Sequence, residues 1–176
     1  MKFSALLVLL LTTGFVLCGC RGLQSEFQKT ELRKAMPTAV LNGSTLRLSS
    51  SLTRLPQTKG FDLKGVLTIT SDSNAFPKHV EAYHLALKPS WTGFPGYYVM
   101  NFFRRDGVWK QANHNPNFSA STMLENNRVV IEFMWKHQGT GMATKPEHFA
   151  AYDVSVSLSD LKKERHILTT LNVPVQ

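Results

Sequence analysis

The chain has only two thiols, at Cys18 and Cys20, with Gly19 between them. An ionised thiol is a strong nucleophile that can take up a transferred group, form a disulfide or bind a soft metal. No cysteine follows Cys20. A domain formed by the rest of the chain therefore has no disulfide, no cysteine-ligated zinc and no thiol catalyst. The thiol chemistry is confined to the N-terminal segment.

The segment before these cysteines has the layout of a secretory signal. Lys2 gives a basic start, and residues 5–17 form an apolar run. This run is shorter than the roughly 20 residues that a membrane-spanning helix needs, and no later stretch is long or apolar enough to span. We therefore expect export across a membrane and no stable transmembrane helix.

Residues Leu17-Cys18-Gly19-Cys20 end the apolar run. They resemble the lipobox of bacterial lipoproteins, which is a leucine, a small residue, a glycine or alanine, and the cysteine that is modified. Cys18 stands where alanine, serine or threonine is usual, and it keeps that position small. The resemblance implies cleavage before Cys20 and attachment of a diacylglyceryl group to its thiol, often with a third acyl chain such as palmitate. The alternatives are an ordinary signal peptide with incidental cysteines and a cytosolic protein with an apolar N-terminus.

A lipid anchor at Cys20 implies a water-soluble body held permanently at a bilayer, because two or more acyl chains hold firmly where one binds reversibly. Arg21 follows the cysteine. In Gram-negative lipoproteins an aspartate at that place commonly means retention at the inner membrane. The resemblance therefore implies an outer-membrane anchor facing the periplasm, if the source is Gram-negative.

The rest of the chain shows no motif of a catalytic or metal site. The histidines are scattered, at His79, His84, His114, His137, His148 and His166. None has a zinc-binding spacing, and neither a nucleophile elbow nor a phosphate-binding glycine loop is present. Gly139-Thr140-Gly141 is interpreted as a hairpin tip and Glu132 as a solvent-facing carboxylate. We predict no catalytic residue, no metal and no cofactor, although a hydrolase whose carboxylates meet only in the fold stays open.

The basic excess suggests a first candidate site. The formal charge is +8, from 20 Lys and Arg against 12 Asp and Glu. A patch around the Asp106-Gly107 turn consists of Arg104, Arg105, Trp109 and Lys110, and a second basic cluster lies within residues 162–165. Guanidinium groups and an indole could bind an acidic or phosphate-bearing partner. The alternative is a solvated turn with a core tryptophan. On an exported protein these cations suit lipid head groups, envelope polysaccharide or an acidic protein rather than nucleic acid.

A second candidate site is an aromatic loop within residues 89–98, PSWTGFPGYY. Its candidate residues are Trp91, Phe94 and Tyr97. Exposed aromatic rings in a loop can stack on sugar rings or form a protein-binding hot spot. The alternative is a loop folded over the end of the core.

Period-two alternation of apolar and polar residues predicts the elements that position these sites. The predicted strands are 39–48, 61–70, 80–87, 97–105, 128–135, 152–158 and 166–175, with a possible irregularity at Asn42-Gly43. In the last strand Ile167, Thr169, Leu171, Val173 and Val175 are expected on one face. The Asp106-Gly107 turn predicts a hairpin.

These elements predict an all-β fold, an antiparallel two-sheet β-sandwich of about seven to eight strands. A closed barrel is the alternative. Residues 1–19 are predicted to be a lipoprotein signal peptide, residues 20–38 a lipid-anchored spacer and residues 39–176 the β-sandwich domain.

No motif of the domain points to a protein family, so its function is inferred from its predicted location. We expect a lipid-anchored envelope protein that binds or assembles a partner and is not an enzyme. The alternatives are a glycan- or lipid-binding module that uses the aromatic loop and, less favoured, an envelope hydrolase. The expected partners are the membrane and an envelope protein or anionic envelope component. The sequence predicts no oligomeric state.

Overall fold

The computed structural model describes residues 35–78, 80, 82–91, 98–105, 108–112, 115–138, 145–159 and 165–176. These residues form ten β-strands and one 3₁₀ helix. The strands are β1 (Thr38–Leu41), β2 (Ser44–Pro56), β3 (Phe61–Ser71), β4 (Ala82–Pro89), β5 (Tyr98–Arg105), β6 (Val108–Gln111), β7 (Phe118–Glu125), β8 (Arg128–Gln138), β9 (Ala151–Ser159) and β10 (Arg165–Pro174), and the helix is η1 (Pro146–Phe149). The predicted signal peptide and Cys20 lie outside the described residues. Within the described residues, no helix has the length and apolar character to cross a membrane.

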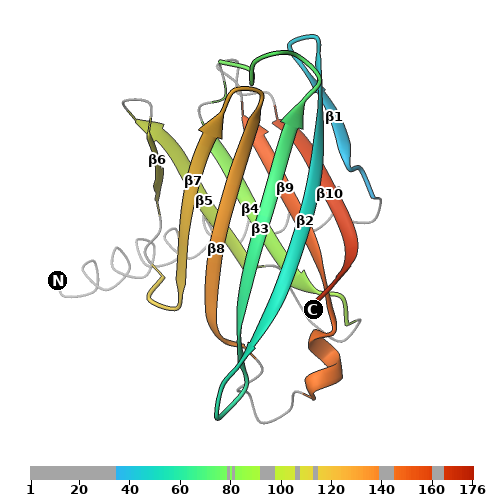
Figure 1. The fold of residues 1–176 in the computed structure, drawn as a ribbon, viewed down its shortest axis with the longest axis vertical. Coiled ribbons are helices and arrows are strands. Elements are labelled where there is room, and N and C mark those ends of the chain that lie inside the picture. Colours follow the sequence, from blue (N-terminus) through green and yellow to red (C-terminus); the bar gives the residue numbers. More distant parts are fainter. Residues whose placement is uncertain are drawn as a thin grey trace, which may run out of the picture. The chain divides into compact units, whose positions relative to one another are not determined.

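The strands form two five-stranded sheets that pack face to face (Figure 1). The β3 sheet has the order β1-β2-β3-β8-β7, and the β4 sheet has the order β10-β9-β4-β5-β6. Neighbouring strands are antiparallel throughout both sheets. The predicted antiparallel sandwich is therefore confirmed, with more strands than predicted.

A tight turn, the short second strand of the predicted hairpin (β6) and an unpredicted strand (β7) account for the additional strands. Asn42 and Gly43 have φ angles of 49° and 80°, and the resulting tight turn splits the predicted strand 39–48 into β1 and β2. β2 then continues to Pro56, well beyond the predicted end. The sequence predicts no strand over 118–125, where small and polar residues blur the alternation. Pairing with β8 nevertheless makes this segment β7.

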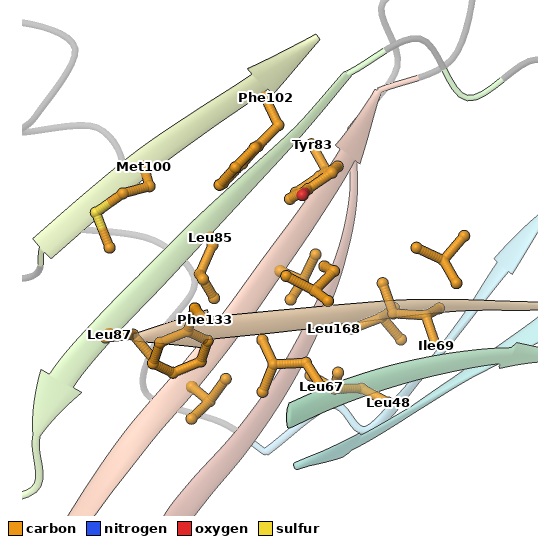
Figure 2. Packing of buried hydrophobic residues seen from close by; sticks show 14 of the residues in the cluster. Leu48, Leu67, Ile69, Tyr83, Leu85, Leu87, Met100, Phe102, Phe133 and Leu168 are labelled. Carbon is orange, nitrogen blue, oxygen red and sulfur yellow. The ribbon is translucent and has the colours of Figure 1, made fainter. Parts of the chain in front are cut away.

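The core lies between the two sheets, because the strand alternation directs apolar side chains inward. Figure 2 shows Leu48, Leu67, Ile69 and Phe133 of the β3 sheet packed with Tyr83, Leu85, Leu87, Met100, Phe102 and Leu168 of the β4 sheet. Full burial of one such apolar side chain contributes about 1.5–3 kcal/mol. Glu132 lies between the buried residues Ile131 and Phe133 and is exposed, as predicted.

The face prediction for the last strand is wrong in its first half. Leu168 joins the core, whereas Ile167 and Thr169 lie on the other face of β10. The pairing with β9 shifts ahead of Val173, where Asn172 has a φ of 52°, and this irregularity returns Val173 to the core. A strict period of two cannot locate such a shift, which moves every following side chain to the other face.

One side of the sandwich is tied together across the two sheets. Met36 and Thr169 exchange two backbone hydrogen bonds, with N–O distances of 3.0 and 2.8 Å. At the C-terminus, the Gln176 N–H donates to the Leu52 carbonyl at 3.0 Å. Met36 falls within residues 20–38, so strand pairing begins inside the stretch predicted as a spacer. The opposite side ends in β6 and β7, to which no further described strand is added.

Two buried tyrosines predict a loss of stability at high pH. Burial raises the pKa of both Tyr83 and Tyr152 above the ordinary value of 10.0. In the unfolded chain these phenols ionise near pH 10. Above about pH 10 the unfolded chain loses these phenol protons while the folded protein keeps them. The free energy of unfolding is therefore unaffected by these groups below about pH 10 and falls above it by about 1.4 kcal/mol per pH unit for each tyrosine. Urea unfolding at intervals from about pH 8 to about pH 11 measures this slope.

Tyr152→Phe is the suitable variant for this measurement, because the Tyr152 hydroxyl has no hydrogen-bond partner among the described residues. We expect it to keep or raise the stability at neutral pH, because it removes a buried hydroxyl without a partner, and to make the alkaline slope shallower. An unchanged slope contradicts the assignment to this phenol.

Candidate ligand-binding site

Aromatic side chains from both sheets and from η1 gather at one end of the sandwich. They are Phe61, Trp91, Tyr98, Trp135, Phe149 and Tyr152, and together with Arg54 and His148 we call them the aromatic end. The fold brings them together because Trp91 follows β4, Tyr98 begins β5 and Phe61 begins β3. In Figure 1 this is the lower end, where η1 lies. Of the predicted aromatic loop, Trp91 belongs to this cluster, whereas Phe94 and Tyr97 lie outside the described residues.

Trp91 stacks on His148 of η1, with ring centroids 3.9 Å apart and 1° between the ring planes. Both side chains are half-buried. The Nδ1 atom of His148 accepts a hydrogen bond from the Lys145 N–H at 3.2 Å, so the neutral imidazole carries its proton on Nε2. Ser90, just before Trp91, donates its N–H to the Ala151 carbonyl at 2.9 Å. The stack is thus anchored on both sides and includes an imidazole N–H donor.

Arg54 lies on β2 and brings a positive charge to the same end. Its Cζ atom lies 4.5 Å from the centroid of the Phe61 ring. Its Nη2 group donates to the Phe149 carbonyl at 3.1 Å. The Phe149 ring packs edge-on against Phe61, with centroids 5.6 Å apart. Arginine is seldom buried without such partners. These contacts therefore hold the guanidinium in a fixed position.

Two tyrosines complete the aromatic end. Tyr98 is 38% exposed and lies edge-on to the buried Trp135, with centroids 4.0 Å apart. Tyr152 is fully buried. Burial raises the pKa of the Tyr152 phenol, the nearby Tyr98 raises it further, and the Arg54 guanidinium lowers it. A buried hydroxyl without a hydrogen-bond partner costs about 1–3 kcal/mol. The Tyr152 hydroxyl, which has no such partner among the described residues, is therefore an unusual feature beside a cation and a partly exposed ring.

This combination of groups suits recognition of a polar ligand with apolar faces. Aromatic rings pack against C–H groups, while guanidinium, imidazole and phenol groups form hydrogen bonds with hydroxyl or carboxylate oxygens. A small number of fixed polar groups among aromatic rings is typical of ligand sites.

Sequence reasoning missed Arg54, His148 and Tyr152. The sequence contains a local indication for Arg54. It continues the alternating positions of Leu48 and Leu52, whose side chains face the core, and a charged residue at such a position is unusual. No local pattern marks His148 or Tyr152, whose neighbours come from distant segments.

The structure divides the predicted basic patch between the two faces of the β5–β6 hairpin. Arg104 is paired with Trp109, and the indole packs against the core, 4.9 Å from the Tyr83 ring. Lys110 is the next residue of β6 and lies on the opposite face. Arg105 pairs across the predicted hairpin. The tryptophan thus has the core position of the alternative interpretation, and partner binding by the basic residues stays a prediction.

His84 and His148 have separate hydrogen-bond partners. His84 Nδ1 lies 2.6 Å from Asn101 Oδ1, whereas His148 Nδ1 accepts from the Lys145 N–H. Among the residues that the structure describes, no three His, Cys, Asp or Glu side chains are grouped to hold a metal ion. His79 and His114 lie outside the described residues.

Comparison of the sequence with protein-family models and with curated proteins gives no match. Among solved structures, the chain is similar to a family 9 carbohydrate-binding module from Caldicellulosiruptor kristjanssonii in complex with glucose, with a TM-score of 0.40 and 9% identity over 77% of this chain and 72% of that chain. It is also similar to the same kind of module in complex with cellotriose, with a TM-score of 0.40 and 10% identity over 81% of this chain and 73% of that chain.

Proposed function

We propose that this chain is a lipid-anchored protein of a bacterial cell envelope whose sandwich domain binds an envelope glycan at the aromatic end. The segment Leu17-Cys18-Gly19-Cys20 supports the anchor through its resemblance to a lipobox. Arg21 in place of an aspartate supports an outer-membrane anchor that faces the periplasm, if the source is Gram-negative. The proposal gives the protein no catalytic role.

The observation that carries the glycan proposal is the presence of partly exposed rings beside fixed polar groups. Trp91 is half-buried on His148, and Tyr98 is 38% exposed against Trp135. A sugar ring offers C–H groups to such rings and hydroxyl groups to the neighbouring donors.

A glycan suits this end better than an acyl chain does. The Arg54 guanidinium and the Tyr152 hydroxyl are polar groups with low access to water, and an apolar ligand would desolvate them further without forming hydrogen bonds. The excess of basic over acidic residues also favours the acidic polysaccharides of an envelope over neutral lipid. We therefore favour the glycan-binding alternative over a purely scaffolding role.

Co-sedimentation of the mature protein with purified peptidoglycan sacculi tests the proposal. Tyr98→Ala is expected to weaken binding about fivefold to tenfold, because one aromatic contact is worth about 0.5–1.5 kcal/mol beyond its buried area. Two of the three tryptophans, Trp91 and Trp135, lie at the aromatic end. Their fluorescence should change on addition of soluble glycan fragments, including in a Trp109→Phe variant.

Phe103→Ala is the matched control. Phe103 lies on β5, as Tyr98 does, and is 43% exposed compared with 38% for Tyr98, but it lies outside the aromatic end. We expect this control to bind sacculi like the unchanged protein. Equal binding by both alanine variants, or no binding to sacculi by the unchanged protein, contradicts the proposal.

A further inference from the structure

β7 is an edge strand of the β3 sheet. It pairs with β8 along one side, and no described strand pairs with the other. The β1 edge of the same sheet adjoins the bridge between Met36 and Thr169 that joins the sheets, and β6 of the β4 sheet has only 4 residues. β7 has 8 residues. A free edge of this length presents a row of N–H and C=O groups that can pair with another strand.

The sequence of β7 lacks the features that usually protect an edge. Phe118–Glu125, FSASTMLE, contains no lysine, arginine or proline. Its one charge, on Glu125, is paired with Arg128, with 2.5 Å between Oε2 and Nη2. Met123 is 47% exposed and Leu124 is 46% exposed. The edge is therefore electrically neutral and apolar toward its C-terminal end.

We propose that β7 pairs with β7 of a second copy of this chain, antiparallel about a twofold axis, so that two β3 sheets become one continuous sheet. Pairing centred on Ser121 places Ser121 opposite Ser121 of the partner subunit and Leu124 opposite Phe118 of the partner subunit. In an antiparallel pair, opposite residues lie on the same face. Phe118 and Leu124 are six residues apart and therefore lie on the same face of β7. The half-exposed Leu124 thereby gains an apolar neighbour from the partner subunit.

The chemistry of the edge favours a second copy over a charged partner. An acidic or basic peptide finds no free ion partner on β7, whereas identical neutral edges meet with no charge penalty. A twofold arrangement satisfies the free edges of both copies at once. The net charge of +8 opposes association at long range, and this repulsion is screened beyond about 10 Å at 0.1 M salt. The dimer should therefore tighten as salt is raised.

Light scattering on the full-length protein in detergent solution, corrected for bound detergent, measures the association. One added strand pair is a small interface, so we expect a dissociation constant on the order of micromolar. We expect it to fall as the salt concentration rises from about 50 mM to about 500 mM.

Ser121→Lys is the decisive variant. It places two ammonium groups opposite each other across the twofold axis, and like charges directly opposite are destabilising. We expect dimerisation to weaken about tenfold or more. Ser51→Lys is the matched control, because Ser51, Val66, Glu132 and Ser121 form one cross-strand row, but Ser51 lies on the internal strand β2. Circular dichroism shows whether each variant keeps its sheet content.

Mixing copies that carry Ser121→Lys with copies that carry Ser121→Glu should restore dimers, because opposite charges then meet across the axis. A monomer at every salt concentration overturns the proposal. So does a dimer that Ser121→Lys leaves intact, or one that loosens as salt rises. None of these readouts depends on glycan binding or on the lipid anchor, so the two proposals fail separately.

Discussion

Replacing Cys20 with serine is expected to move the protein from the membrane fraction to the soluble fraction of the envelope. A hydroxyl does not replace the thiol as acceptor of the diacylglyceryl group. The loss of two acyl chains lowers the free energy of membrane binding by about 0.8 kcal/mol for each CH₂ group that they bury in the bilayer. Fractionation followed by mass spectrometry of the N-terminal peptide measures both the location and the acyl mass.

Cys18→Ser is the matched control for this experiment. It removes the other thiol of the chain but keeps a small residue where the lipobox usually has alanine, serine or threonine. We expect this variant to be cleaved before Cys20, lipidated and retained at the membrane. If Cys20→Ser is also processed at the same site and stays membrane-bound, the anchor assignment is wrong and the proposed location loses its support.

Hydrophobic alternation predicted the fold correctly where strands run without interruption. In β8 and β9 the alternating residues enter the core as expected, including Ile131 and Phe133 from one sheet and Val154 and Val156 from the other. Such strands pack one face on the core and leave the other outside it, so their sequence carries the period directly. Antiparallel pairing of these strands then defines the sandwich.

Alternation failed where the neighbouring strand, rather than the segment itself, determines the structure. β7 is a strand because it pairs with β8, although FSASTMLE has few large apolar residues. In β10, the set of residues that face the core changes ahead of Val173, because Asn172 adopts a positive φ and the pairing register shifts. Neither a partner strand nor a register shift leaves a reliable local signal.

The aromatic end illustrates the same limit for the candidate site. Its contacts join Arg54 to Phe149 and Tyr98 to Trp135, pairs that are far apart along the chain. The sequence pointed to the loop around Trp91, because aromatic residues cluster there with Pro and Gly. It could not supply the partners that sheet packing brings to this loop.

Gly65→Ala is expected to destabilise the domain by about 2 kcal/mol, within the range of overpacking substitutions in a tightly packed core. Gly65 lies on β3 directly opposite Phe133 of β8. A Cβ atom on Gly65 would lie 2.1 Å from Cζ and 2.2 Å from Cε1 of the Phe133 ring. The ring is itself buried and stacked on Phe118 at 5.7 Å, so it cannot move aside without disturbing the core. Glycine is required here because the ring fills the space of its missing side chain.

A double-mutant cycle with Phe133→Leu separates this clash from a general effect of losing a glycine. In the Phe133→Leu background the same Gly65→Ala change should cost much less in the free energy of unfolding, because the obstructing ring atoms are gone. Gly43→Ala is the control. A Cβ atom added at Gly43 would have no neighbour within 4 Å, but this residue has a φ of 80°. The loss of stability in Gly43→Ala therefore arises from backbone strain. That cost should be the same in both backgrounds. Urea unfolding of the four Gly65 and Phe133 combinations measures the coupling, and a coupling energy near zero contradicts the clash.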